Sequence, residues 1–258
     1  MLGCIIQARM GSTRFPGKVM ELVDDVNPAL YQTISQLRES KILKNIVVAT
    51  TTNSEDDMIA NFAEKLNVEV FRGNPTDVLS RYYNCAKFFS FSSILRITAD
   101  CPLIDPLIVD QGILKFLENN YDYVTNTFPR TFPDGNETEI FSFDVLELAY
   151  KEAKLPSERE HVTPYFRNNR KQFKIFNFTY KNDISDLRWT LDYEQDLKLI
   201  KIIFSSIKER PVHLNNILQL LENKPELIEI NNDHKPNEGY KKSLKEDEEF
   251  LKKINNEK

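Results

Sequence analysis

The sequence is poor in glycine and cysteine, and it has no long apolar run. Its 258 residues include only seven glycines and three cysteines, Cys4, Cys85 and Cys101. Cysteines so few and so scattered build neither a disulfide framework nor a zinc site, which favours a reducing compartment. No apolar run approaches the roughly 18 residues of a membrane helix, and no signal peptide precedes the first apolar segment. We therefore expect a cytoplasmic protein with no membrane partner.

Negative charge exceeds positive charge over the whole chain, with 39 Asp and Glu against 34 Lys and Arg. The formal net charge is -5, whereas a general nucleic-acid binder would normally be basic, so we expect no nucleic-acid partner. Hydrophobic residues make up 41% of the chain, which is ample for a buried core. An acidic protein can still bind a nucleotide if it concentrates positive charge at one site.

Short apolar, β-branched runs alternate with helical patterns in the first half of the chain. We expect strands at 2–7, 45–51, 68–71 and 93–98, and helices at about 29–40, from 54 onward, at 77–89 and at 105–117. This alternation predicts an α/β fold, a mostly parallel twisted sheet with helices on both faces. Ligands bind such sheets outside the carboxyl ends of the strands. The polar segments 7–18, 51–57, 72–77 and 99–105 are therefore expected to meet at one crevice.

The alternation weakens in the second half of the chain. We expect a small extended insertion at about 123–143, helices at 144–153, 157–168 and 193–207, and strands at 173–179 and 187–191. The α/β domain would then span residues 1–224. Residues 225–258 are polar and rich in Lys and Glu, which predicts a tail with a solvated helix.

The loop at residues 7–18 concentrates glycine and positive charge. Its two glycines and three cations are Gly11, Gly17, Arg9, Arg14 and Lys18. Glycine lets backbone N–H groups converge on an anion, arginine offers phosphate a planar fork, and lysine offers it a point charge. The loop matches neither G-x-G-x-x-G nor G-x-x-x-x-G-K-[ST], so it predicts neither a dinucleotide site nor a P-loop. It predicts a triphosphate site, the alternative being a surface loop with incidental basic residues.

Six motifs, taken in order along the chain, resemble the cytidylyltransferase family. They are IIQARMGSTRFPGKV at the start, RGNPTDVLSRY at 72–82, RITADCPLIDP at 96–106, EREHVTP at 158–164, RWTLDYEQDL at 188–197 and NEGYKKSL near the end. The resemblance is greatest to the branch with the spore-coat polysaccharide biosynthesis cytidylyltransferase and the CMP-acylneuraminate and CMP-ketodeoxyoctonate synthetases. It covers most of the chain and implies a nucleotide-diphospho-sugar transferase-like fold. The implied reaction is transfer of CMP from CTP to a sugar acid, with Mg²⁺ as cofactor and a homodimer in contact near residues 123–143.

The resemblance also implies which residues bind the metal and the nucleotide. Asp100 and Asp192 would hold Mg²⁺, which prefers carboxylate oxygens, although either could simply cap a helix or turn. The catalytic residues would be Arg14, Lys18 and Asp100. The nucleotide-binding residues would be Gln7, Ala8, Arg9, Gly11, Ser12, Arg14, Lys18, Thr51, Thr52, Arg72 and Asp77. For Asp77, helix capping is an equal alternative.

The acceptor is expected to bind within residues 130–161. The family's Asp-Gly-Leu-Asp-Val-Glu-Val-Phe pattern becomes DGNETEIF here, with Glu137 in place of an aspartate. Glu137 and Glu139 stand two apart and would share one face of a strand, where they could recognise hydroxyl or ammonium groups or a second metal ion. Arg159 could hold the acceptor's carboxylate, and His161 could bond a hydroxyl or assist its deprotonation. An exposed strand face and a solvated helix face are the plainer alternatives.

Three other functions stay open at this point. The acceptor could be a phosphorylated polyol or a phosphonate instead of a sugar acid. A glycosyltransferase of similar fold would usually need an Asp-x-Asp motif, and Ala99-Asp100-Cys101 supplies only one aspartate. A non-catalytic nucleotide-binding regulator is the third alternative.

Overall fold

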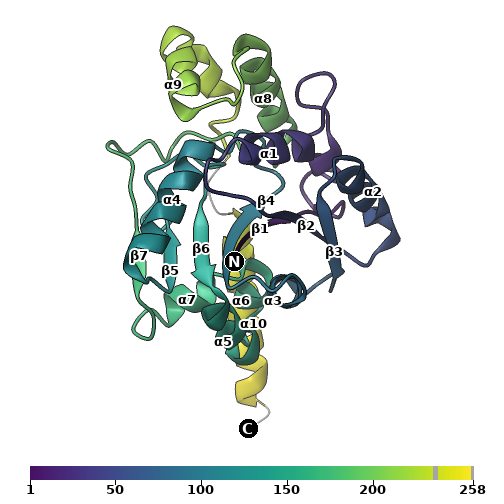
Figure 1. Cartoon of the computed structure of the whole chain (residues 1–258), viewed down its shortest axis with the longest axis vertical. Helices are drawn as coiled ribbons and strands as arrows, with labels where there is room; N and C mark the ends of the chain where they lie inside the picture. Colours follow the sequence, from purple (N-terminus) through teal and green to yellow (C-terminus); the bar gives the residue numbers. More distant parts are fainter. Residues whose placement is uncertain (235–237, 257–258) are drawn as a thin grey trace.

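A seven-stranded sheet forms the centre of the protein, for which a computed structural model describes residues 1–234 and 238–256 (Figure 1). The strand order is β3-β2-β1-β4-β6-β5-β7. The strands are β1 (Leu2–Gln7), β2 (Ile46–Thr51), β3 (Glu69–Gly73), β4 (Ser93–Thr98), β5 (Tyr123–Thr125), β6 (Glu139–Ser142) and β7 (Ile175–Asn177). Only β6 runs antiparallel to its neighbours, β4 and β5. The predicted mostly parallel sheet is confirmed.

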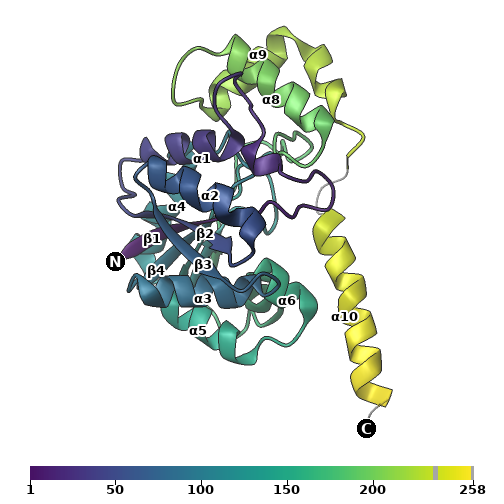
Figure 2. The same ribbon diagram turned by 90° about the vertical axis from the view of Figure 1, so that its right-hand side faces the viewer.

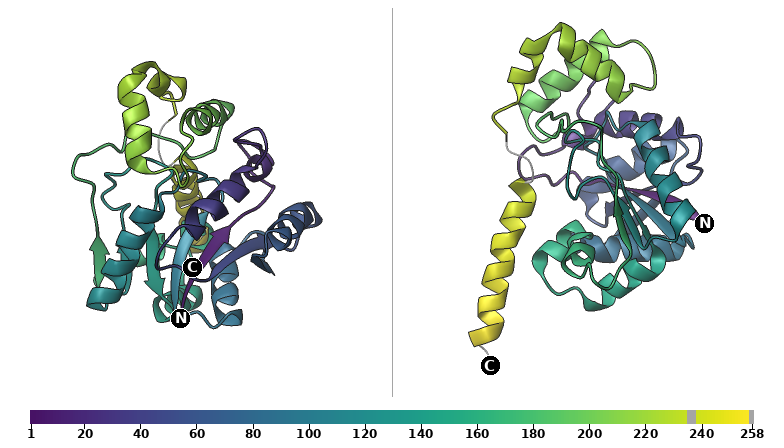
Figure 3. Two further views of the ribbon diagram at one scale, coloured as in Figure 1. Left: turned by 45° about the horizontal axis from the view of Figure 1, so that its top comes forward. Right: turned by 90° about the vertical axis from the view of Figure 1, so that its left-hand side faces the viewer.

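Helices cover both faces of this sheet (Figure 2). One face carries α1 (Ala29–Arg38), α2 (Asp57–Lys65) and α4 (Pro106–Asn119), and the other carries α3 (Val78–Phe88) and α5 (Phe143–Glu152). Two short helices, α6 (Pro156–His161) and α7 (Pro164–Asn168), follow α5. Beyond α1 lie α8 (Glu194–Ser206) and α9 (Leu214–Asn223), and α10 (Glu238–Asn256) runs along the outside near α6 (Figures 2 and 3). The part of the chain that the structure describes also has three 3₁₀ turns: η1 (Lys18–Met20), η2 (Ser54–Asp56) and η3 (Pro225–Ile230).

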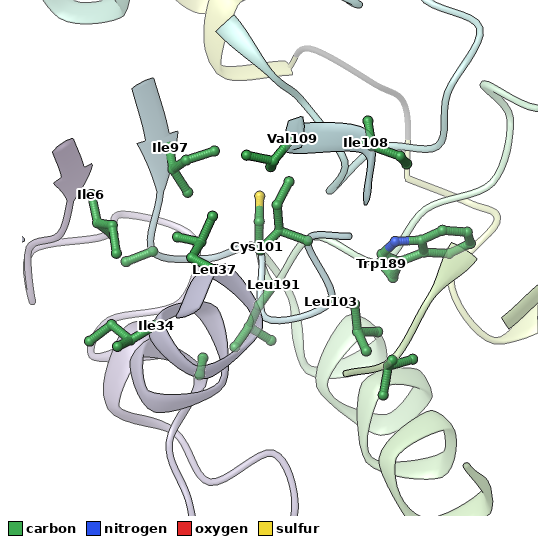
Figure 4. Packing of buried hydrophobic residues seen from close by; sticks show 14 of the residues in the cluster. Ile6, Ile34, Leu37, Ile97, Cys101, Leu103, Ile108, Val109, Trp189 and Leu191 are labelled. Carbon is green, nitrogen blue, oxygen red and sulfur yellow. The ribbon is translucent and has the colours of Figure 1, made fainter. Parts of the chain in front are cut away.

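The strands are apolar on both sides because each side faces a separate core. Along β1, Cys4 and Ile6 belong to the core under α1 and α4, whereas Ile5 belongs to the core with α3 and α5. A strand buried on both faces reads as a continuous apolar run, which is how β1 was recognised. Figure 4 shows the core under α1 and α4, a cluster of buried side chains that includes Leu37, Val109 and Trp189.

The strand order also fixes where a ligand can enter. From β1 the chain crosses to β2 on one side, and from β4 it crosses toward β5 on the other. Gln7 pairs with Thr98, so β1 and β4 end at the same level. Loops that leave in opposite directions open a crevice between them, and α/β proteins bind ligands at such a switch point. The loops that flank this crevice are residues 8–17 and 99–105.

Two expectations for the second half of the chain were wrong, and one helix was not predicted. Residues 187–191 form no strand, because Trp189 N–H and Leu191 N–H donate to the carbonyls of Asp134 and Asp100 in loops. The helix expected at 157–168 is broken into α6 and α7 at Val162, which has a φ of 69° and stands two residues before Pro164. Helix α9 was missed, although its Leu214, Ile217 and Leu221 recur at helical spacing.

Candidate active site

Lys18 joins the two predicted metal ligands at the switch point. Gly17, with a φ of 76°, turns the loop into η1 and so directs Lys18 into the crevice. The Lys18 ammonium donates to Asp100 and lies 2.7 Å from Asp192 Oδ1. Asp192 is held beside Asp100 because Leu191 N–H donates to the Asp100 carbonyl at 2.8 Å. Residues from three distant segments therefore converge on one point.

Further cations surround Asp192. Arg14 Nη2 lies 2.5 Å from Asp192 Oδ1, and Arg188 Nη2 lies 2.9 Å from Oδ2. Burial alone would raise the pKa of Asp192, but Lys18 and Arg14 outweigh burial and hold that pKa well below its ordinary value. Burial likewise opposes the charge on Lys18, yet Asp100 and Asp192 keep its pKa above the ordinary value. Both groups are therefore ionised at neutral pH.

This pair of carboxylates fits a divalent cation that also binds phosphate. Within residues 1–234 and 238–256 there is no group of three or more His, Cys, Asp or Glu side chains that could hold a metal ion by themselves. Asp100 and Asp192 nevertheless converge on one cation, the Lys18 ammonium. Mg²⁺ is commonly bound by one or two carboxylates, with water and substrate phosphates as the remaining ligands. The donor set is therefore suited to Mg²⁺ bound together with a nucleotide.

Two connected cavities open on either side of Asp100. We call the first the loop-side cavity; it has a volume of about 660 Å³ and is lined by the loop after β1. The second, the acid-side cavity, has a volume of about 540 Å³. Arg14, Arg96, Asp100 and His161 line both. A reaction centred on Asp100 can therefore join a ligand in one cavity to a ligand in the other.

The two cavities differ in charge. The cations that line the loop-side cavity are Arg9, Arg14, Lys18, Arg81, Arg96, Arg159 and Lys242, and its carboxylates are Asp100, Glu160, Glu238 and Glu246. The acid-side cavity has the cations Arg14, Arg96, Arg130, Arg167 and Arg188, and the carboxylates Asp100, Asp134, Glu137, Glu139, Asp192 and Glu238. An excess of cations in an acidic protein marks the loop-side cavity as the place for a polyanion.

Most of the predicted nucleotide-binding residues lie in the loop-side cavity. Those that line it are Gln7, Ala8, Arg9, Ser12, Arg14 and Lys18. The other predicted nucleotide-binding residues do not line either cavity: they are Gly11, Thr51, Thr52, Arg72 and Asp77. Their binding to the nucleotide stays a prediction.

Thr51, Arg72 and Asp77 make contacts with the protein itself. Thr51 is buried and donates to Asp56, which also accepts from Met10 N–H at 2.7 Å and so ties the loop to the end of β2. Arg72 turns away from the crevice to pair with Asp57. Asp77 accepts from Ser80 N–H at 2.8 Å, which is the helix-capping alternative, and it also pairs with Arg159.

Glu137 and Glu139 both line the acid-side cavity but have different partners. Glu137 precedes β6 and lies 3.0 Å from Arg130, whereas Glu139 begins β6 and lies 2.7 Å from Arg96 and 2.9 Å from Arg167. Burial raises the pKa of Glu137 to about 8. Burial would also raise the pKa of Glu139, but its two arginines outweigh burial and lower that pKa to about 2.

The other two predicted acceptor residues, Arg159 and His161, both line the loop-side cavity. Arg159 does not line the acid-side cavity, and its contact with an acceptor carboxylate stays a prediction. His161 lines both cavities, and burial lowers its pKa to about 4, so its imidazole is neutral at neutral pH.

Four arginines of the acid-side cavity were not predicted as site residues: Arg96, Arg130, Arg167 and Arg188. Arg96 gave a signal, because a lone charge inside the buried run SILRIT is costly unless it is paired. Arg130 and Arg188 lie on irregular loops and Arg167 on the short helix α7, where no periodic pattern marks them.

The fold and the site together define the class of protein. A doubly wound sheet carries a cationic loop and two converging carboxylates at its switch point, which is the arrangement of a nucleotidyltransferase. The sequence model of the family described as "Cytidylyltransferase" matches residues 3–233. The chain belongs to the cytidylyltransferase family, and it is a nucleotidyltransferase.

Known relatives and a solved structure agree with this assignment. The chain is 38% identical over 229 residues to an uncharacterised protein of Methanocaldococcus jannaschii, covering 88% of this chain and 93% of that one. It is 30% identical over 230 residues to the spore coat polysaccharide biosynthesis protein SpsF of Bacillus subtilis, covering 86% and 94%. It is 30% identical over 180 residues to a 3-deoxy-manno-octulosonate cytidylyltransferase of Chloroherpeton thalassium, covering 67% and 69%. A cytidylyltransferase structure from Leptospira borgpetersenii superposes with a TM-score of 0.84 at 37% identity, covering 88% and 96%.

In residues 1–234 and 238–256, no helix has the length and apolar character needed to cross a membrane.

Proposed function

We propose that this protein transfers CMP from CTP to a hydroxyl group of a sugar acid and releases pyrophosphate, for the synthesis of a surface polysaccharide or glycan. The observation that carries the proposal is the convergence of Lys18, Asp100 and Asp192 where the two cavities meet. In this assignment CTP occupies the cationic loop-side cavity and the acceptor occupies the acid-side cavity.

The reaction requires positioning and charge stabilisation from the protein. The acceptor hydroxyl oxygen attacks the α-phosphorus of CTP, a new O–P bond forms, and the bond to the β-phosphate oxygen breaks in line with it. The neutral imidazole of His161, which lines both cavities, is available to take the proton of the hydroxyl. Arg14 and Lys18 stabilise the charge that develops on the departing pyrophosphate. When Asp100 and Asp192 hold Mg²⁺, the ion adds further positive charge at the phosphates.

Lys18 has to change partners during this cycle. In the structure its ammonium neutralises both carboxylates. If Asp100 and Asp192 held Mg²⁺, the Lys18 ammonium would be released from them and could bind a phosphate oxygen of CTP.

A sugar acid as acceptor is supported by the arginines among the acidic residues of the acid-side cavity. In this proposal Arg167 is the partner of the acceptor carboxylate, the place proposed from sequence for Arg159. Glu137 and Glu139 line the same cavity and can form hydrogen bonds with sugar hydroxyls. The relative from C. thalassium is named for an acid sugar acceptor, and the relative from B. subtilis is named for polysaccharide synthesis.

A panel of acceptors tests the proposal. Pyrophosphate release from CTP and Mg²⁺ is measured with nonulosonic acids, ketodeoxyoctonate and phosphorylated polyols, with reactions lacking acceptor as controls. Release that depends on an acid sugar supports the proposal, and release only with a phosphorylated polyol or a phosphonate favours that alternative. If no acceptor yields pyrophosphate, the catalytic proposal is wrong.

A further inference from the structure

Helix α10 lines the active site and overlaps the NEGYKKSL motif, beyond residue 233, where the match to the family model ends. The sequence predicted a solvated helix for this part of the chain. In the structure its first nine residues, 238–246, border both cavities: Lys242, Ser243 and Glu246 line the loop-side cavity, and Tyr240 lines the acid-side cavity. The remainder of α10 extends past the body of the protein (Figures 2 and 3).

Specific polar contacts hold α10 in this position. Asp247 is 6% exposed and accepts from Ser157 N–H at 2.8 Å and from Ser157 Oγ at 2.6 Å. One turn earlier, Ser243 is also 6% exposed and lies 3.0 Å from His161 Nε2. Buried polar groups that hydrogen-bond to each other allow only one register between a helix and the helix it packs on. The register of α10 on α6 is therefore set, and with it the side chains that face the cavity.

A third contact joins the start of α10 to the segment that carries Asp192. Glu238 accepts from the hydroxyl of Tyr193, the residue that follows Asp192. A Cβ atom on Gly239 would stand 3.9 Å from Arg14 Nη1, so the backbone of α10 approaches the phosphate-binding loop. Helix α10 therefore contacts both α6 and the residue that follows Asp192.

In this position Lys242 adds a cation to the loop-side cavity from outside the loop. Its ammonium lies 3.8 Å from Glu246, the next residue of α10 on the same face, and its side chain is 72% exposed. Arg9, Arg14 and Lys18 approach the same cavity from the loop after β1. A flexible lysine is a common partner of phosphate oxygens.

We infer that Lys242 binds the β- and γ-phosphates of the nucleotide, so that α10 completes the triphosphate site. The α-phosphorus has to lie where the two cavities meet, near Asp100, because the acceptor attacks it there. Lys242 lines only the loop-side cavity and is therefore on the side away from the acceptor. The inference rests on the proposed function, which puts CTP in this cavity.

Isothermal titration calorimetry of the full-length protein with CTP and with CMP, in Mg²⁺ and without acceptor, tests this inference. Lys242→Ala is expected to raise the Kd for CTP about five- to tenfold, the size of one polar contact of an exposed side chain, and to leave the Kd for CMP unchanged. Lys241→Ala is the matched control, because it removes the same charge from the neighbouring position and Lys241 lines neither cavity. It is expected to change the Kd for CTP less than twofold.

A second variant tests the anchoring of α10. Asp247→Ala removes the contact with Ser157 and is expected to raise the Kd for CTP as Lys242→Ala does. The double variant is expected to be no weaker than either single variant, because both changes remove the same contact. Fluorescence of the buried Trp189 checks that each variant is folded.

The outcomes separate this inference from the proposed function. Equal Kd values for CTP in Lys242→Ala and Lys241→Ala would overturn the inference, as would an equal loss for CTP and CMP or additive effects in the double variant. Failure of the unaltered protein to bind CTP would overturn the proposed function and, with it, the inference.

Discussion

Replacing Arg188 by methionine is expected to lower the free energy of unfolding by about 3 kcal/mol. The Arg188 guanidinium is buried and bonds three carboxylates, Asp134 at 2.7 Å, Asp192 at 2.9 Å and Asp196 at 3.0 Å. Removing one partner of a buried ion pair costs roughly 3–5 kcal/mol, because it leaves the other charge uncompensated. We expect the low end of that range, since each carboxylate keeps another donor.

The retained donors are specific. Asp134 keeps Arg130 at 3.1 Å, Asp192 keeps Lys18 at 2.7 Å, and Asp196 keeps the side-chain amide of Asn231 at 2.8 Å. Arg188→Lys preserves the charge but loses the planar fork that reaches three carboxylates. Its loss in free energy of unfolding is therefore expected to be smaller than that of Arg188→Met.

Urea unfolding followed by the fluorescence of Trp189 measures this loss. Trp189 is the only tryptophan of the chain, is fully buried and adjoins Arg188. With an m-value of about 3 kcal/mol/M, a loss of about 3 kcal/mol lowers the midpoint by about 1 M. The exposed Arg170 provides the control, since Arg170→Met is expected to change stability by less than about 0.5 kcal/mol. An Arg188→Met midpoint equal to that of Arg170→Met would refute the reasoning.

Three further predictions follow from the site. The pKa of Glu139 is about 2 in the fold against an ordinary 4.5, so its ionised form adds stability above pH 4.5 that is lost as the pH falls toward 2. Glu139→Gln should flatten this dependence in urea midpoints taken across that range, and an unchanged slope would contradict it. Gly17→Ala puts a side chain at a φ of 76°, which costs about 1 kcal/mol, so urea unfolding should find a midpoint lower by about 0.3 M, and an unchanged midpoint would argue against the loop geometry. Raising salt from about 0.05 to 0.5 M should raise the Kd for CTP, since salt screens exposed charges, whereas a salt-independent Kd would be incompatible with a cationic cavity.

Much of the sheet and its crevice could be predicted because local patterns determine them. The runs that became β1 and β4 are apolar in every buried position, and β2 is apolar there except at Thr50 and Thr51. The polar segments after β1 and β4 meet at the switch point as expected. Asp100 and Lys18 could be placed in one crevice for this reason. The segment at 187–191 misled the same reasoning, because its apolar residues pack against α8 and α9 while its backbone bonds to loops.

The acid-side cavity and α10 could not be predicted, because tertiary contacts decide them. The partners of Glu139, Arg96 and Arg167, are 43 and 28 residues away in sequence, and no local pattern links the three. Helix α10 has a polar composition typical of a solvated helix, yet Ser243 and Asp247 are buried by partners 82 and 90 residues away. A polar residue on such a helix carries no signal of its own that it is buried.

Pyrophosphate release from CTP by Asp100→Asn, compared with the unaltered protein under saturating Mg²⁺ and acceptor, tests the proposed chemistry most directly. Asp100 lies where the two cavities meet, so the loss of its charge is expected to lower the rate by about 100-fold or more. The exposed Asp144→Asn serves as the control and is expected to retain the full rate. A full rate of pyrophosphate release by Asp100→Asn would contradict the assignment of the reaction to this site.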